Sequence, residues 1–312
     1  MIFSDPPIAN TCLACHVCPL ACRLAEGQIG VCKARQAQGG TIVSLNYGRA
    51  AALALDPIEK KPLANFHPHT TILSYGSFGC NLKCTFCQNW EIAHGNEGVR
   101  GAFSLTSLEG VRGNACLTPS FPWVDTQELS PRLLVEQAAS LKDKNCLGVA
   151  LTYNEPLVCP EYVVDVARIA HEHDLKLAIV TNGYVMPAIA EHVFSVVDAA
   201  NIDLKAFNQD FYTMVGAPHG LAVVKRSIEI ALAKGCHVEV TTLVISGLND
   251  SPEEMAQEAA WLASLSPEIP LHISRFSPAY KMTNKPPTPR DTIIKLEAIA
   301  REHLTHVYKG NV

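Results

Sequence analysis

The chain has 312 residues, of which 48% are hydrophobic and 18% are charged, and its formal net charge at pH 7 is -5. This composition argues against disorder, and the spread of charges leaves no extended basic patch of the kind that binds nucleic acid. We therefore expect one large α/β domain with a small additional part, and a nucleic-acid substrate is not favoured.

The start of the sequence and its apolar runs bear on location. Residues 1–10 lack the cationic and apolar regions of a signal peptide. No stretch reaches the roughly 18 uninterrupted apolar residues of a membrane span. We expect a cytoplasmic protein with no membrane contact, in which the 12 cysteines bind metal more readily than they form disulfides.

The segment from about residue 10 to 35 is dense in cysteine and glycine and has neither helical nor strand periodicity, so we expect it to fold around a metal. Its cysteines are Cys12, Cys15, Cys18, Cys22 and Cys32. Four ligands suffice for a closed structural site. Zinc, a mononuclear iron and an auxiliary cluster all suit thiolate ligands, and structural zinc is the interpretation we favour.

The next residues lead into the main domain. The alternation from Thr41 to Leu55 predicts a hairpin, and residues 56–62 read as a proline-punctuated connector. We therefore divide the chain into a Cys-rich subdomain with its connector, residues 1–65, and a main domain, residues 66–312.

Apolar, β-branched runs then recur with helical segments between them, which predicts a parallel sheet of six strands with helical crossovers. The predicted strands are Thr71–Tyr75, Gly148–Thr152, Lys176–Thr181, Asp198–Asp203, His237–Val244 and Pro270–Ser274.

Helix ends are also recognisable. Ser130 and Ser251 each precede a proline, as a capping residue precedes the first helical position, and Ser251 with Glu254 fits a capping box. A helix is predicted from about Leu221 to Lys234, ending at Gly235, with an apolar stripe that should pack on the sheet.

The segment from about Gly95 to Asp125 interrupts this scheme. It is rich in glycine, serine and proline, and the sequence Glu-Gly-Val-Arg-Gly occurs in it at 97–101 and again at 109–113. A local duplication or chance is the simpler interpretation of this repeat. A lid or a docking role for the segment stays open.

The run Cys80-Asn-Leu-Lys-Cys84-Thr-Phe-Cys87 directly follows a predicted buried strand. Iron-sulfur cubanes usually have four thiolate ligands, so a compact loop with three suggests a cluster with one iron left open to a small molecule. The alternatives are a zinc knuckle or buried core cysteines.

Polar residues follow every predicted strand, where the carboxyl ends of parallel strands form one rim. After the cysteine run, they are Tyr153-Asn-Glu155, Asn182-Gly183-Tyr184, Asp203-Leu-Lys205, Thr241 and Thr242 with Asn249-Asp250, and Arg275. We expect the active site at this rim.

These motifs, together with Val180-Thr-Asn-Gly183, Asn201-Ile-Asp-Leu-Lys205 and Val307-Tyr-Lys-Gly-Asn-Val312, resemble the radical S-adenosylmethionine (radical SAM) enzyme of the AmmeMemoRadiSam system. That family is itself similar to pyruvate formate-lyase activating enzymes, and the likeness runs from about Cys15 to the end of the chain. It implies a partial (β/α)6 barrel with a small Cys-rich N-terminal subdomain.

The resemblance implies that Cys80, Cys84 and Cys87 hold a [4Fe-4S] cluster whose open iron binds SAM. Reductive cleavage of SAM then gives a 5′-deoxyadenosyl radical that abstracts hydrogen from a substrate not identified by the sequence, which would make the protein an oxidoreductase. It also implies an electron donor such as flavodoxin or ferredoxin, and Memo-type and AMMECR-type partner proteins.

The same resemblance assigns roles to residues around the cluster. Glu155 would accept from the SAM ammonium group, although a solvated carboxylate is the alternative. Activating enzymes carry two glycines where this chain has Tyr153 and Asn154, which puts the backbone contacts of that loop in doubt. Asn154 is nevertheless kept among the SAM-binding candidates.

Thr181 and Asn182 would contact the ribose or methionyl part of SAM, although Asn182-Gly183 equally fits a simple turn. Asp203 and Lys205 should share one strand face and meet the zwitterionic end of SAM, although a partly buried ion pair is the alternative.

The spacing of Cys15, Cys18, Cys22 and Cys32 matches the family's N-terminal pattern, so these four are the implied ligands of a second site and Cys12 is the extra cysteine. Two other functions stay open for the whole chain. One is a glycyl-radical-enzyme activating enzyme, and the other is a zinc-binding scaffold with no turnover.

Overall fold

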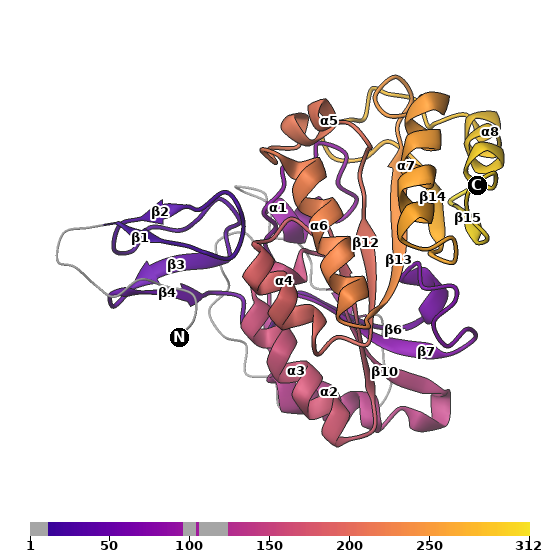
Figure 1. Cartoon of the computed structure of the whole chain (residues 1–312). Helices are drawn as coiled ribbons and strands as arrows, with labels where there is room; N and C mark the ends of the chain where they lie inside the picture. The colour runs from indigo at the N-terminus through magenta and orange to yellow at the C-terminus, as the bar shows by residue number, and fades with distance from the viewer. Residues whose placement is uncertain (1–11, 96–103, 106–123) are drawn as a thin grey trace.

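A computed structural model describes residues 12–95, 104–105 and 124–312 (Figure 1). The main body is a large sheet with helices packed along it, and the segment from β1 to β4 projects from one side as a small lobe of short strands. The predicted α/β class with a small Cys-rich N-terminal part is confirmed. The repeated pentapeptide at 97–101 and 109–113 lies outside the described residues.

The main sheet has nine strands. In spatial order they are β15 (Val307–Gly310), β14 (Leu271–Arg275), β13 (His237–Val244), β12 (Ala199–Asp203), β11 (Lys176–Thr181), β10 (Cys146–Leu151), β7 (Thr71–Gly76), β6 (Ala52–Pro57) and β8 (Ser104–Leu105). Neighbours from β15 to β7 are parallel, whereas β6 is antiparallel to β7. The carboxyl ends of seven strands therefore lie along one rim.

The remaining strands form three two-stranded sheets: β1 (Leu13–Ala14) with β2 (Arg23–Leu24), β3 (Arg35–Gln38) with β4 (Thr41–Ser44), and β5 (Arg49–Ala50) with β9 (Gln127–Glu128). The α-helices are α1 (Trp90–His94), α2 (Pro131–Ala139), α3 (Pro160–Glu172), α4 (Pro187–Phe194), α5 (Gln209–Met214), α6 (Gly220–Ala233), α7 (Pro252–Leu265) and α8 (Arg290–Ala300). Short 3-10 turns occur at Ile58–Lys60, Lys142–Lys144 and Pro156–Val158.

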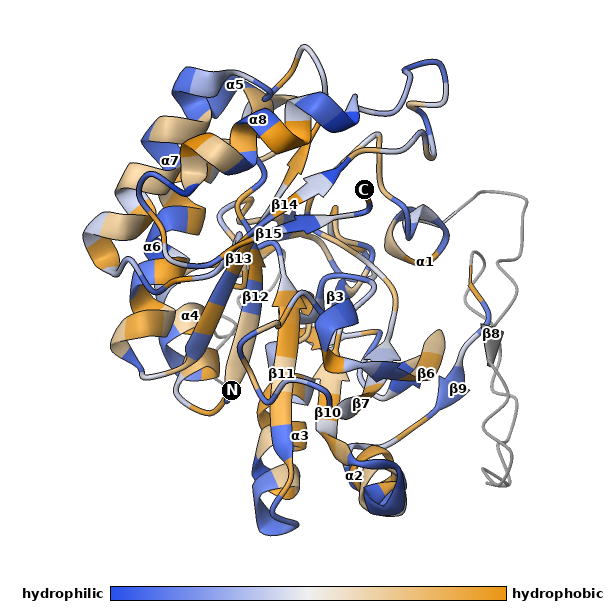
Figure 2. Cartoon of the chain, turned by 90° about the vertical axis from the view of Figure 1, so that its right-hand side faces the viewer, coloured by the Kyte–Doolittle hydropathy of each residue, from blue (hydrophilic) through white to orange (hydrophobic). Residues whose placement is uncertain are grey.

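Two apolar layers cover the two faces of the sheet. Helices α2 to α8 pack their buried stripes on the outer face. Figure 2 shows the orange of apolar residues along much of β10 and β11. On the inner face, three small residues leave room for Leu63 and Phe66 from the connector. They are Ala150, Ala178 and Ala199. The connector thus fills the inner space below the rim and leaves the rim itself open.

The predicted helix before Gly235 is confirmed as α6, whose apolar stripe is buried on the sheet. Gly235 follows it with φ +78°, a left-handed conformation that favours glycine. The Ser130 and Ser251 hydroxyls accept hydrogen bonds from Leu133 and Glu254 amides, so both N-caps are confirmed. No helix among the described residues is long and apolar enough to cross a membrane.

Three predictions about local structure are wrong. The segment from Thr41 to Leu55 is not a hairpin, because β4 pairs with β3 and β6 pairs with β7. Alternation identifies a strand but not its partner. The sheet also has more strands than the six expected, because β6 pairs antiparallel with β7, β8 pairs with β6 at that edge, and β15, a short strand containing a glycine, adds a parallel strand at the other edge. Finally, the Glu254 side chain does not complete a capping box but accepts from the Phe207 amide and Asn208.

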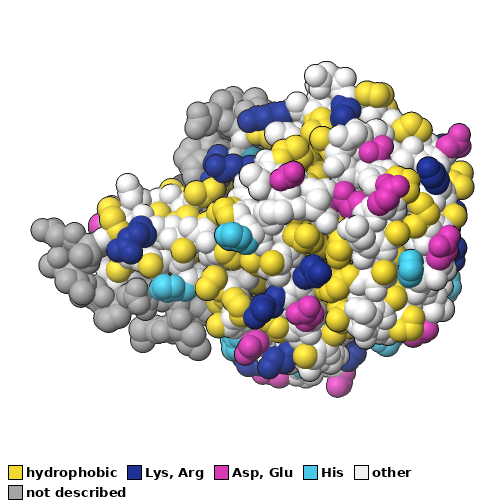
Figure 3. Space-filling model, turned by 45° about the horizontal axis from the view of Figure 1, so that its top comes forward, with side chains coloured by type: hydrophobic (Ala, Val, Ile, Leu, Met, Phe, Trp, Pro, Cys, Tyr) yellow, Lys and Arg dark blue, Asp and Glu magenta, His cyan; other side chains and the backbone are white. Residues whose placement is uncertain are grey.

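Charged side chains of both signs are interspersed with apolar ones over the face that Figure 3 presents. No large area of a single charge is visible on the described part of that face. This distribution agrees with the absence of an extended basic patch in the sequence.

Candidate active site

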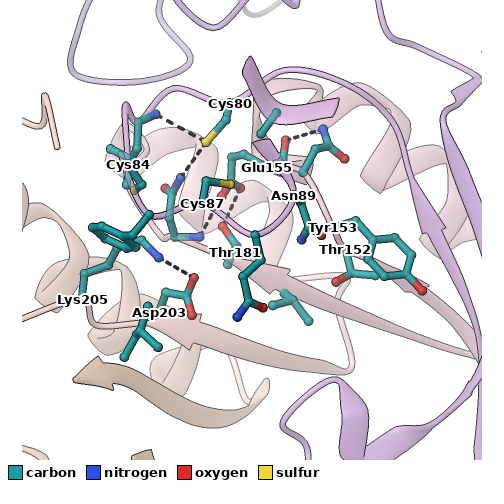
Figure 4. A pocket seen from close by; sticks show the side chains of 18 of the residues that line it. Cys80, Cys84, Cys87, Asn89, Thr152, Tyr153, Glu155, Thr181, Asp203 and Lys205 are labelled. Atoms are coloured by element: carbon teal, nitrogen blue, oxygen red, sulfur yellow. Dashed lines mark hydrogen bonds and ion pairs between the residues drawn. The ribbon is translucent and has the colours of Figure 1, made fainter. Parts of the chain in front are cut away.

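The cysteine loop, residues 77–89, runs from the end of β7 to α1. Its three cysteines line a chamber of about 270 Å³ at the carboxyl rim of the sheet (Figure 4). Gly79, directly before the first cysteine, has φ +91°, and a Cβ atom there would lie 2.5 Å from the Cys32 carbonyl oxygen. Only glycine fits this turn, so the position of Cys80 depends on it.

Hydrogen bonds from neighbouring strand ends hold the loop in place. The side-chain amide of Asn182 donates from Nδ2 to Asn81 Oδ1 at 2.9 Å, and the same nitrogen lies 3.7 Å from Cys80 Sγ. Asn81 in turn donates to the Tyr184 carbonyl at 2.7 Å. Asn182 lines the chamber. Its side-chain amide is engaged by Asn81 and lies near Cys80 Sγ, so it positions the cysteine loop. Burial raises the pKa of the nearby Cys84 thiol to about 12.

Glu155 lies in the wall of the chamber and links two strand ends. Its carboxylate accepts from the Thr181 hydroxyl at 2.6 Å, from the backbone N–H of Asn182 at 2.7 Å and from the backbone N–H of Leu157 at 2.9 Å. Because the side chain is only 3% exposed, the solvated-carboxylate alternative is wrong. Burial raises its pKa to about 7, and the three donors oppose that shift.

The loop after β10 departs from the glycine pair of activating enzymes, and the structure shows how the larger residues fit. Tyr153 adopts φ +70°, the left-handed conformation that glycine would provide. Asn154 braces the start of the cysteine loop, since Oδ1 accepts from the Ser77 amide at 2.9 Å and Nδ2 donates to the Gly79 carbonyl at 3.1 Å. Asn154 lines the chamber, but both polar atoms of its side chain are engaged in these hydrogen bonds to the cysteine loop.

Asp203 and Lys205 both line the chamber and are paired with each other, with Nζ 2.7 Å from Oδ2 (Figure 4). Burial alone would lower the pKa of the Lys205 ammonium, but Asp203 raises it above its ordinary value. The lysine therefore stays charged at neutral pH. Their shared face is confirmed, and the ion pair that the sequence left as an alternative is present.

Other strand-end residues divide into two groups. Thr241 lines the chamber, is 7% exposed, and its hydroxyl has no hydrogen-bond partner in the described part of the chain. Thr242, Asn249 and Arg275, which also follow strands in the sequence, do not line the chamber: their side chains donate to the Leu204, Lys205 and Thr288 carbonyls. Strand alternation turns Thr242 to the opposite face from Thr241.

The sequence did not single out several residues that also line the chamber. These are Gln88, Asn89, Thr152, Ser274 and Asn311. Thr152 and Ser274 stand at or beside the ends of β10 and β14, so their positions were predictable from the strand pattern. Asn311 belongs to the C-terminal motif Val307–Val312, and nothing local in the sequence indicates that it returns to the rim.

The N-terminal cysteines gather at a second place. Cys15, Cys18, Cys22 and Cys32 line one small cavity, whereas Cys12 is exposed and does not line it. Over the described ranges, no three Cys, His, Asp or Glu side chains are already gathered around the position of a single metal ion. That holds for the three cysteines of the main chamber as well as for these four.

Known proteins share both the sequence and the fold. An uncharacterized protein of Methanocaldococcus jannaschii is 36% identical over 302 residues, which cover 96% of this chain and 81% of that protein. The pyruvate formate-lyase-activating enzyme of Clostridium pasteurianum is 24% identical over 186 residues, 58% of this chain and 65% of the enzyme. A radical SAM methyltransferase from Sphaerobacter thermophilus shares the fold, with a TM-score of 0.53 at 18% identity over 78% of this chain and 67% of that one.

A family match covers the cysteine loop and the ends of β10, β11, β12 and β13, all of which contribute residues to the chamber. Residues 75–259 match the Radical SAM superfamily, which is more than half of the chain. Such a family implies a [4Fe-4S] cluster and SAM as its cofactors. The protein belongs to the radical SAM superfamily.

Proposed function

We propose that this protein is a radical SAM oxidoreductase in which Cys80, Cys84 and Cys87 hold a [4Fe-4S] cluster and the adjoining chamber holds SAM. The observation that carries the proposal is that these cysteines line the same chamber as the Asp203–Lys205 pair. Sulfur ligands, a carboxylate and an ammonium group thus surround one space that opens at the strand ends.

The residues present fit the two cofactors. Three thiols of the cysteine loop leave one corner of a four-iron cluster without a protein ligand. Asp203 and Lys205 offer opposite charges to an amino-acid zwitterion, and Thr241 offers a buried hydroxyl that no described residue satisfies. Glu155 adds a carboxylate within the wall, for which the SAM ammonium group is the proposed partner.

When bound, the reduced cluster and SAM would supply a 5′-deoxyadenosyl radical that abstracts a hydrogen atom from the substrate. The residues of the chain position the cofactor ligands and close the chamber from below. Asn182 and Asn154 fix the cysteine loop from two sides, and Thr181 fixes Glu155. The fill below the rim, made by Leu63 and Phe66, keeps water from entering through the sheet interior.

The candidate protein partners follow from resemblance to known families. The motifs of the chain support a place in the AmmeMemoRadiSam system, with Memo-type and AMMECR-type proteins as partners. The likeness to a pyruvate formate-lyase-activating enzyme supports a second candidate, abstraction from a glycine of a partner enzyme. The reducing surroundings that such thiol-rich sites need support a cytoplasmic location.

An outer cleft supports a protein electron donor. Cys80 lines the chamber and also a neighbouring cleft of about 620 Å³, and Leu82, Ala93 and His94 line both as well. Lys83 and Lys281 are exposed in this cleft, and no described residue that lines it is acidic. Tyr280 stacks on Trp90 in its wall, with ring centroids 5.2 Å apart. A flavodoxin or ferredoxin with an acidic face suits this surface.

The test is anaerobic reconstitution followed by SAM cleavage with dithionite. Release of 5′-deoxyadenosine is expected from the wild-type chain and not from Cys84→Ala, while Cys236→Ala, a buried cysteine remote from the chamber, should retain it. A protein that binds only zinc and releases no 5′-deoxyadenosine would instead be a scaffold. A backbone radical on an added glycyl-radical enzyme would identify the activating function.

A further inference from the structure

The four N-terminal cysteines share their cavity with a buried arginine that has unused donors. Arg35 is 2% exposed and lines the cavity together with the four thiols. Its Nη1 donates to both carboxylate oxygens of Glu161, each at 2.8 Å. Its Nε and Nη2 have no hydrogen-bond partner among the described residues. Two buried guanidinium donors without an acceptor are costly unless a ligand completes the site.

We propose that Cys15, Cys18, Cys22 and Cys32 bind one zinc ion as thiolates and that Arg35 donates its free N–H groups to their sulfurs. Four thiolates around Zn²⁺ form a dianion, which is stable in a buried place only when positive charge and donors surround it. The Arg35 guanidinium lies beside the Cys15 thiol and supplies both.

The backbone of the lobe is arranged for sulfur anions as well. The amides of Val17, Leu20 and Ala34, each two residues after a cysteine, donate to the sulfurs of that cysteine. The backbone around these cysteines is therefore suited to negatively charged sulfurs.

The size of the cavity favours one ion over a cluster. Its volume is about 10 Å³, close to that of a single water-sized sphere, whereas the chamber at Cys80 has about 270 Å³. Zinc is preferred over larger centres because it takes a closed tetrahedral site of four cysteines.

The ion would also fix the cysteine loop of the active site. The Cys32 carbonyl accepts from the Cys80 amide at 3.2 Å, and the Val17 carbonyl accepts from the Met186 amide at 3.0 Å. Gly79 packs directly on Cys32. A lobe that is folded around zinc therefore braces the loop from outside, and its loss should loosen Cys80.

Metal analysis of the full chain after anaerobic reconstitution tests this inference separately from the proposed function. The wild type should hold about one zinc per chain in addition to about four irons. Cys18→Ser should lose the zinc and keep most of the iron, and Cys12→Ser, the exposed matched control, should keep both. Replacing Cys80, Cys84 and Cys87 by alanine should remove the iron and leave the zinc, whether or not the protein cleaves SAM.

The role of Arg35 has its own readout. Arg35→Gln should weaken zinc binding by about 10- to 100-fold in chelator competition, while Glu161→Gln, which alters only the other side of the guanidinium, should bind zinc nearly as the wild type. If Cys18→Ser does not fold, cobalt substitution of the wild type should still give the sulfur-to-cobalt charge-transfer bands of a tetrathiolate. Absence of zinc and of those bands, or extra iron and sulfide lost on Cys18→Ser, would overturn the proposal.

Discussion

The phenol of Tyr153 donates a 2.7 Å hydrogen bond to the carboxylate of Asp56, a residue 97 positions earlier in the chain. Lys61 approaches the same carboxylate at 2.7 Å and lies 4.5 Å from the centroid of the Tyr153 ring. This anchor offsets the strain of about 1–3 kcal/mol that a non-glycine residue has in the left-handed region. The β10 loop therefore keeps a glycine-like backbone by means of a side chain.

Substitutions at Tyr153 separate the anchor from the strain. Tyr153→Ala keeps the strained backbone and loses the anchor, so we expect SAM affinity to fall about tenfold or more, since an anchor and its packing contribute on the order of 1–3 kcal/mol. Tyr153→Gly removes the strain and should recover part of that loss. Isothermal titration with SAM measures both. Equal affinity of the alanine variant and the wild type would show that the anchor is not needed.

The backbone course of the site was predictable from the sequence, but the hydrogen bonds were not. Apolar runs placed Glu155, Asp203 and the cysteine loop on one rim, because parallel strands end together. The same pattern could not show that Asn182 turns its amide to the cysteine loop, since rotamers depend on contacts between distant segments. For the same reason, the sequence could not predict that Tyr153 bonds Asp56 on β6.

Glu155 connects two loops, so its charge should matter for both stability and binding. In Glu155→Gln, one acceptor becomes an N–H donor that faces either the Asn182 amide or the Thr181 hydroxyl. We expect a loss of about 1–3 kcal/mol in unfolding free energy and a SAM affinity at least tenfold lower.

Thr181→Ser is the matched control because it keeps the hydroxyl that bonds Glu155. It should remain within about 0.5–1.5 kcal/mol of the wild type, the usual cost of one buried methyl group. Urea unfolding and SAM titration of both variants test the assignment. A glutamine variant that binds SAM as tightly as the wild type would remove Glu155 from the proposed ligand set.

Glu239 should make stability depend on pH. It is fully buried below the rim and accepts from His237, His272 and the Asn65 and Ala64 amides. Burial opposes ionisation, but these donors outweigh it and lower the pKa from 4.5 to about 2. The stabilisation is therefore complete above pH 4.5 and is lost as the pH falls from 4.5 towards 2.

The size of this effect can be isolated by mutation. At pH 3.5 the wild type should have lost about 1 kcal/mol more than Glu239→Gln, relative to each protein at pH 6. Urea unfolding of the metal-free chain followed by circular dichroism measures it. Glu136→Gln, on the exposed side of α2, should keep the wild-type slope, and an unchanged slope in Glu239→Gln would contradict the assignment.

The connector shows where sequence patterns stop being informative. Residues 56–62 read as a linker because of their prolines, yet the Pro62 carbonyl accepts from Asn201 at 2.8 Å and Lys61 is buried at Asp56. A proline-rich segment without periodicity gives no sign that it fills the inside of a sheet. The buried Glu239, in the middle of an apolar strand, was the available hint that backbone amides approach from elsewhere.

Charge reversal in the outer cleft tests the route of the electron. If an acidic donor docks beside Cys80, Lys83→Glu should slow reduction by flavodoxin about tenfold or more at low ionic strength, because like charges then meet. Reduction by dithionite, which needs no docking, should be unchanged. Lys144→Glu makes the same charge change before β10, at the opposite end of the strands, and should leave both rates as in the wild type.

If Lys83→Glu and Lys144→Glu slowed reduction by flavodoxin equally, overall charge and not this cleft would govern the encounter. A wild-type rate for Lys83→Glu and Lys281→Glu together would exclude the cleft as the docking surface.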